Sequence, residues 1–352
     1  MKIQKTWINN LITYAIVIVA YVVMEILMSQ GLIPNLIKGI LVWLCVYAIA
    51  AVSLNLTVGI SGELSLGHAG FMCVGAFAGA FLTKVFYGQV PDAVCFIMAI
   101  VVGAAAAGLM GFLIGIPVLR LRGDYLAIVT LAFGEIIKNV LQALYVGIDN
   151  SGLHVAMSAA NLKLGEGAMK IIDGPQGITR VQRFSNFTIG IILLLIALVI
   201  VLNFINSRTG RAVMAIRDDR IAAEATGLNI TKYKLLAFSI SAMLAGVAGV
   251  LYAHNLSTLQ AIKFDYNMSI LILVYVVLGG IGSIRGSMVA AVVLYLLPEL
   301  LRGLDKYRML IYAIVLIVIM IFNWNPTLIK LRKRYSIRRL IERGGAKQNG
   351  NA

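Results

Sequence analysis

The chain has 352 residues, of which 60% are apolar and 13% are charged, and its mean hydropathy is +0.92. A soluble globular protein is about half apolar and a quarter charged, so this composition excludes an ordinary soluble fold and predicts one polytopic membrane bundle. The net charge of +15 lies in short connecting segments and a C-terminal tail, which argues against nucleic-acid binding and for orientation in a membrane.

The apolar runs predict ten membrane-spanning helices, because a helix needs about 20 apolar residues to cross a bilayer. The candidate spans are 8–28, 36–58, 64–85, 93–119, 125–146, 187–206, 235–254, 268–281, 286–301 and 309–322. Segments 64–85, 268–281 and 286–301 are glycine-rich or short, which is typical of broken or re-entrant helices. We therefore expect an all-α integral membrane protein, with a polytopic bundle of about 8–10 transmembrane helices in contact with lipid.

Lysine and arginine are in excess in the connecting segments on one side of the predicted bundle, and we expect that side to be cytoplasmic. Both termini then lie in the cytoplasm, as residues 1–7 and a basic tail, 324–352. Residues 8–323 form the transmembrane domain, with an extracytoplasmic loop at 147–184 and a cytoplasmic loop at 207–234. The three cysteines lie in apolar runs without metal-ligand spacing, so we expect no disulfide, metal site or cofactor.

Segment 59–81 combines closely spaced glycines with polar residues at membrane depth. Polar groups facing lipid cost several kcal/mol, so these groups must face protein or a water-filled cavity. Two interpretations stay open: tight helix packing with internally paired polar atoms, or a broken helix lining a solute path. The candidate path residues are Ser61, Gly62, Glu63, Ser65, Gly67, His68 and Gly70. A second glycine-broken segment, 279–286, holds the corresponding place if the spans divide into two fives, which indicates an inverted repeat.

Glu135 and Lys138 stand three residues apart on one face of the fifth predicted span, close enough to neutralise each other. We interpret them first as a buried structural pair, because one paired charge does not make a proton relay. Glu135 is nevertheless retained as a candidate residue of the solute path.

The charged island, Ser207–Lys234, interrupts the apolar sequence and carries the signals of a short helix between loops. Asp218 or Asp219 suits the N-cap, and Gly227 suits the left-handed position after the helix end. We expect this helix to dock on a cytoplasmic partner through Arg217, Asp218, Asp219, Arg220, Ala222, Ala223, Glu224 and Gly227. The alternative is a solvated loop whose arginines only set the topology.

Several long motifs in order resemble the permease subunits of branched-chain amino acid ABC importers. They are SGELSLGHAGFMCVGAFAGA, LRLRGDYLAIVTLAFGEII, GRAVMAIRDDRIAAEATGLNITKYKLLAFSISAMLAGVAGVLYA, VVLGGIGSIRGSMVAA and YRMLIYAIVLIVIMIF. The resemblance covers nearly all of 42–322. It implies a bacterial inner membrane protein that pairs with a second, related permease, two cytoplasmic ATPases and an extracytoplasmic solute-binding protein.

ABC importer permeases carry a Glu-Ala-Ala-x-x-x-Gly motif in the loop that fits the ATPase. Here Ile221 replaces the acid, Ala222, Ala223 and Gly227 keep their places, and Glu224 follows directly. The outer DGPQGI, 173–178, is similar to the family's GGPxGI segment, with Asp173 in place of its first glycine.

The chain contains no Gly-Lys dipeptide and therefore no phosphate-binding G-x-x-x-x-G-K-[ST] loop, so it is expected not to be an enzyme. The resemblance implies that the chain forms the path for branched-chain amino acids while partner ATPases supply the energy. Importers of urea or short amides use similar permeases and stay open as alternatives. A secondary transporter working alone is a third possibility, but it predicts more intramembrane ion ligands than this sequence offers.

Overall fold

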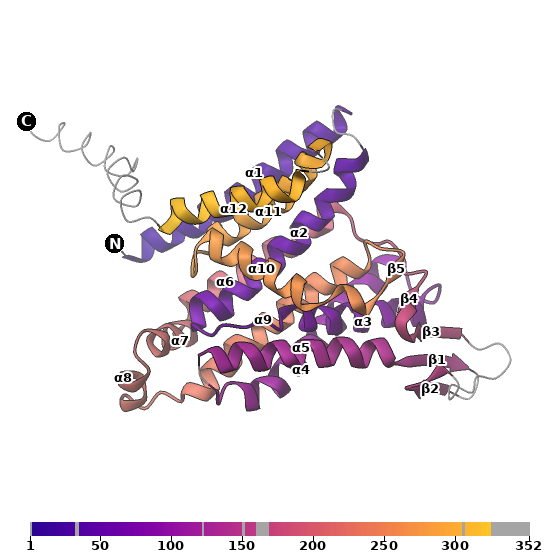
Figure 1. Cartoon of the computed structure of the whole chain (residues 1–352), viewed down its shortest axis with the longest axis horizontal. Coiled ribbons are helices and arrows are strands. Elements are labelled where there is room, and N and C mark those ends of the chain that lie inside the picture. The colour runs from indigo at the N-terminus through magenta and orange to yellow at the C-terminus, as the bar shows by residue number, and fades with distance from the viewer. Residues whose placement is uncertain are drawn as a thin grey trace, which may run out of the picture. The chain divides into compact units, whose positions relative to one another are not determined.

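The computed structural model describes residues 2–31, 35–121, 123–149, 152–159, 169–304 and 307–324, and these residues are mainly helical (Figure 1). Residues up to Val293 form one compact unit, and the residues from Leu294 onward form a second. The basic tail beyond Trp324 and the middle of loop 147–184 lie outside the described residues, so the predictions for these segments are not addressed by the structure.

A helix lies at each of the ten predicted spans. These helices are α1 (Lys2–Ser29), α2 (Asn35–Asn55), α3 (His68–Phe86), α4 (Asp92–Val118), α5 (Asp124–Ala143), α6 (Phe187–Asn206), α9 (Ile230–Ala253), α10 (Tyr266–Gly279), α11 (Ile284–Leu300) and α12 (Arg308–Trp324). Eight stretches of the described residues are long and apolar enough to cross a membrane. Helices α11 and α12, with 17 residues each, are shorter than those stretches. The all-α polytopic fold class is therefore confirmed, within the expected range of spans.

The short elements connect these helices. A π-helix, η1 (Leu56–Ser61), continues α2, and α7 (Arg208–Asp218) and α8 (Arg220–Ala225) form the charged island. The 3-10 turns are η3 (Gly174–Gln176), η4 (Ala261–Lys263) and η5 (Leu301–Leu304). The second compact unit consists, in its described part, of the end of α11, η5 and α12.

Two small antiparallel sheets were not predicted. The first has the order β2-β1-β3, from β1 (Tyr145–Asp149), β2 (Gly152–Ala156) and β3 (Met169–Asp173). The second pairs β4 (Ile178–Thr179) with β5 (Thr258–Leu259). The fifth span, predicted to reach residue 146, ends at Ala143, and Tyr145 and Val146 join β1 instead. A short apolar run fits a strand as well as a helix end, so its periodicity could not decide between them.

The core of the first unit is made by α3, α4 and α9, which pack against one another, with α2 along α9. Glycines and alanines lie at these contacts, since Gly75 of α3 meets Gly246 of α9 backbone to backbone. Large apolar side chains stay exposed on α4 and α5, such as Val101, Leu109 and Ile128, as a lipid-facing surface requires. The strands and the α7–α8 pair lie at opposite ends of this unit (Figure 1).

Candidate functional site

The helix formed by α2 and η1 breaks at Gly62, and α3 begins only at His68. Gly62 has φ +74, a left-handed conformation that glycine adopts without the clash of a Cβ atom. The π-helical turn before it, Leu56–Ser61, is buried throughout. Single π-helical turns next to α-helices are frequent at functional sites. The broken helix predicted from the glycine-rich segment is present.

The second predicted break, between α10 and α11, lies directly against the first. Gly280 and Gly282 have φ +98 and +81, and a Cβ atom on Gly59 would lie 2.3 Å from the Gly282 nitrogen. The fully buried Asn55 joins the two breaks: its Oδ1 accepts from Gly282 N at 2.9 Å, and its Nδ2 donates to Ser287 Oγ at 2.6 Å. Asn55 was not among the predicted path residues, although a polar residue within an apolar run was a visible signal.

The predicted path residues differ in their surroundings. Ser61, Ser65 and His68 are buried, and His68 Nε2 lies 2.8 Å from Ser53 Oγ, so the imidazole is satisfied within the protein. The Ser65 hydroxyl, in contrast, has no hydrogen-bond partner among the described residues. Gly67 and Gly70 pack against the backbone of α5. A buried hydroxyl without a partner costs free energy, because it has lost its hydrogen bonds to water.

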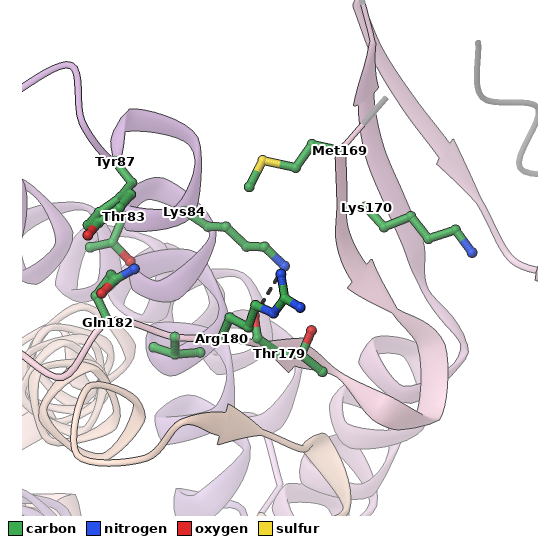
Figure 2. A pocket seen from close by; sticks show the side chains of 9 residues that line it. Thr83, Lys84, Tyr87, Met169, Lys170, Thr179, Arg180 and Gln182 are labelled. Carbon is green, nitrogen blue, oxygen red and sulfur yellow. Dashed lines mark hydrogen bonds between the residues drawn. The ribbon is translucent and has the colours of Figure 1, made fainter. Parts of the chain in front are cut away.

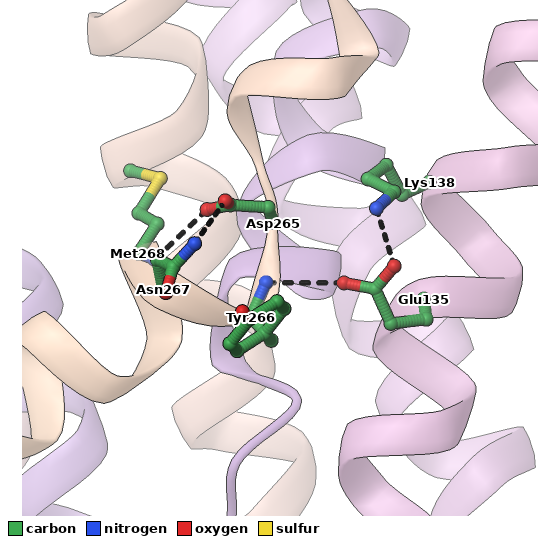
Figure 3. A network of polar contacts seen from close by, with 6 residues as sticks. All are labelled: Glu135, Lys138, Asp265, Tyr266, Asn267 and Met268. Atoms are coloured by element: carbon green, nitrogen blue, oxygen red, sulfur yellow. Dashed lines mark hydrogen bonds and ion pairs between the residues drawn. The ribbon is translucent and has the colours of Figure 1, made fainter.

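Glu135 and Lys138 form the ion pair that their spacing predicts (Figure 3). Glu135 Oε1 also accepts a hydrogen bond from Tyr266 N at 3.0 Å, at the start of α10. Asp265 caps that helix by accepting from Met268 N at 3.0 Å. The pair therefore ties α5 to α10, which agrees with the structural interpretation.

The charged island folds as two short helices with defined ends. Asp219 accepts a hydrogen bond from Ala222 N at 3.0 Å and is the N-cap of α8. Gly227, with φ +83, follows the end of α8, where its N–H bonds to Glu224 O and Leu228 N–H bonds to Ala223 O. This Schellman arrangement closes the helix as the glycine predicts.

The two faces of α8 differ in their exposure to solvent. Ala223 is only 5% exposed and packs with Ile216 and Ile230, whereas Ile221 is 81% exposed. Ala222 and Glu224 are exposed as well. Ile221 and Ala222 therefore lie on the exposed side of α8, and the Glu224 carboxylate lies one turn after Ile221. Of the two alanines expected to meet a partner, only Ala222 is accessible.

Two charged side chains connect the island to the helix break. Arg217 at the end of α7 donates from Nη1 to Gly59 O at 2.8 Å, and its side chain lies over Gly62. Lys234 in the first turns of α9 forms an ion pair with Glu63, and both side chains are nearly buried, at 11% and 12% exposed. Glu63 was expected to line the path, and the structure instead pairs it with the end of the island. Charged hydrogen bonds of low exposure hold their partners in one arrangement.

A buried histidine lies at the opposite end of the unit, just after α9. His254 is 0% exposed, and its ring contacts the rings of Phe96 and Phe184. Its Nδ1 lies 2.8 Å from Val250 O and its Nε2 3.1 Å from Thr83 Oγ1. Burial lowers the pKa of His254 to about 4, because the charged imidazolium loses its hydration.

The family model described as the permease component of the branched-chain amino acid transport system matches residues 36–321. The high-affinity branched-chain amino acid transport system permease protein LivM of Salmonella typhimurium is 35% identical over 315 residues, covering 80% of this chain and 67% of the relative. LivM of Escherichia coli K12 is 34% identical with the same coverage. A probable LivM of Methanocaldococcus jannaschii is 25% identical, covering 78% of this chain and 83% of the relative. None of the solved structures matches.

Proposed function

Since this multi-pass membrane chain belongs to the permease family of branched-chain amino acid transport systems, we propose that it forms part of the path through which an ABC importer takes up leucine, isoleucine and valine. Two cytoplasmic ATPases, a second related permease and an extracytoplasmic solute-binding protein complete the importer. Both termini lie in the cytoplasm, as the distribution of basic residues indicates.

The observation that carries the proposal is the connection between the island and the helix break. Helix α8 is held as a unit by the Asp219 cap and by the Gly227 turn, so a push on it moves it as one body. Arg217 and Lys234 then transfer that movement to Gly59 and Glu63. An island that only sets topology would need no contact with the path.

The two breaks supply the element that moves. The path backbone next to Gly59 is joined through Asn55 to the second break at Gly282, so displacement of one break acts on the other. Non-helical backbone at membrane depth occurs where it is buried in protein or lines a cavity, and the two breaks satisfy that condition. We propose that the rocking of the α2–α3 and α10–α11 breaks opens the path alternately to either side.

The solute meets the path beside the first break. The Ser65 hydroxyl, which has no hydrogen-bond partner within the described part of the chain, supplies a hydrogen-bonding group there. Glu135 stands on α5, against which Gly67 and Gly70 pack, and it orients this wall through Tyr266. These groups suit a small polar or zwitterionic solute. Membership of the permease family favours the branched-chain amino acids among such solutes.

On the cytoplasmic side, the ATPase contacts the exposed face of α8. Ile221 stands where related importers carry an acid, and its exposed side chain makes the contact apolar at that point. Glu224, three residues after Ile221, supplies a carboxylate on the same accessible surface. The chain itself hydrolyses no nucleotide in this scheme.

The test is solute uptake by the reconstituted importer, assembled from this chain and the proteins encoded beside it. Radiolabelled leucine, isoleucine or valine should accumulate in proteoliposomes only with ATP on the cytoplasmic side. Urea and acetamide serve as competing solutes. Accumulation of urea or acetamide in place of leucine would overturn the substrate, and accumulation by this chain alone without ATP would overturn the transport class.

A further inference from the structure

A pocket of about 480 Å³ opens at the end of the first unit that carries the strands (Figure 2). Its wall comes from the end of α3, from β3 and from residues 179–182. The cationic residues Lys84, Lys170 and Arg180 line it, and no acidic side chain does so among the described residues. The Asp173 carboxylate is close enough to act on Lys84 but does not line the pocket, so the wall itself is cationic and favours an anionic occupant.

Arg180 is held in this pocket by a strained backbone. With φ +57, it is the one residue other than glycine in the described part of the chain that has a positive φ. The conformation is fixed on both sides, because Thr179 pairs with Thr258 in the β4–β5 sheet and Val181 N donates to Ser257 O at 3.0 Å. Such strain costs of order 1 kcal/mol and persists where the surroundings enforce it, often at binding sites.

The guanidinium of Arg180 has no hydrogen-bond acceptor among the described residues, and its side chain is exposed. Lys84 Nζ lies near this guanidinium (Figure 2) and donates to Ile171 O and Thr179 O, each at 3.2 Å. An ammonium has three N–H donors, so one stays available to a ligand. Lys170, in contrast, points its ammonium away from both (Figure 2).

We propose that this pocket receives a single carboxylate side chain, Asp or Glu, projecting from the solute-binding protein. The inference rests on the proposed function, which places the strands on the extracytoplasmic side. A free amino acid fits less well, because its ammonium group would enter a pocket whose described wall carries three cations and no carboxylate. An acidic side chain brings only the negative charge, and a guanidinium can bind its two oxygens together.

The experiment titrates the solute-binding protein against the reconstituted importer and measures leucine uptake. We expect Arg180→Gly to raise the binding-protein concentration that gives half-maximal uptake about tenfold, while the maximal rate at saturation stays unchanged. Glycine accepts φ +57 without strain, so this variant removes the charge without burdening the fold. The salt dependence of the half-maximal concentration should become shallower in the same variant.

Lys170→Gln is the matched control. It also removes one positive charge from the pocket wall, but the ammonium of Lys170 points away from Arg180. We expect this control to change the half-maximal concentration less than twofold. An equal effect of both variants, or no effect of Arg180→Gly, would overturn the inference while leaving the importer function intact. If Arg180→Gly instead changed the leucine concentration that gives half-maximal uptake at saturating binding protein, the pocket would be a site for free solute and the inference would be overturned. Absence of any branched-chain uptake by the unaltered importer would instead refute the proposed function.

Discussion

Glu63→Gln tests the connection between the island and the helix break. The substitution removes the carboxylate that pairs with Lys234 while keeping the shape of the side chain. Both side chains are about nine-tenths shielded, so the Lys234 ammonium would be left with little water and no counter-charge. Removing one partner of a buried ion pair costs about 3–5 kcal/mol, and we expect the lower end because some exposure remains.

The assay compares two readouts on the purified importer in proteoliposomes. Thermal unfolding reports the loss of stability, and the ratio of leucine imported to ATP hydrolysed reports coupling. We expect Glu63→Gln to lower that ratio severalfold, because hydrolysis at the ATPases continues while less of the movement of α8 reaches Gly59 and Glu63. The charge-swapped variant Glu63→Lys with Lys234→Glu is the matched control and should recover part of both losses. The reasoning is refuted if Glu63→Gln keeps the unaltered stability and the unaltered leucine-to-ATP ratio.

Three further changes follow from individual contacts. Asn55→Ala leaves the Gly282 N–H and the buried Ser287 hydroxyl without their hydrogen-bond partner, so it should destabilise the chain by about 2–4 kcal/mol in thermal unfolding. An unchanged midpoint would contradict the role of Asn55. Gly227→Ala should cost about 1 kcal/mol and reduce uptake, whereas Gly227→Asn, which tolerates φ +83, should cost less; equal effects would speak against the turn. Burial holds the pKa of His254 at about 4 in the folded chain, below its usual value of 6.5. Protonation of His254 therefore favours the unfolded chain, so the free energy of unfolding should fall by about 3 kcal/mol as the pH falls from 6.5 to 4. His254→Gln should lack that loss when unfolding is measured over the same pH range.

The helices could be predicted because their signals are local. Apolar runs gave a helix at each predicted span, and Asp219 and Gly227 marked the ends of α8 within a few residues. The spacing of Glu135 and Lys138 predicted their ion pair for the same reason. Each of these features depends on residues that are neighbours in sequence.

The assembly of the site could not be predicted, because its partners are distant in sequence. Lys234 meets Glu63 across 171 residues, Arg217 meets Gly59 across 158, and Asn55 reaches Gly282 across 227. The inward direction of Ala223 depends on Ile216 and Ile230, which close over it only after α7 and α9 have packed. The strands at 145–179 depend on pairing between chain segments rather than on periodicity.

Disulfide crosslinking of the island to the ATPase tests most directly that the chain is driven from the cytoplasm. Cysteine replaces Ala222, which is exposed on α8, or Ala223, which is 5% exposed, in a chain whose native cysteines have been changed to alanine. We predict that Ala222→Cys crosslinks to a cysteine in the ATPase cleft, with a yield that changes between nucleotide-free and ATP-bound states, and that Ala223→Cys does not. No crosslink from Ala222→Cys in any nucleotide state, with the importer assembled and active, would contradict the account.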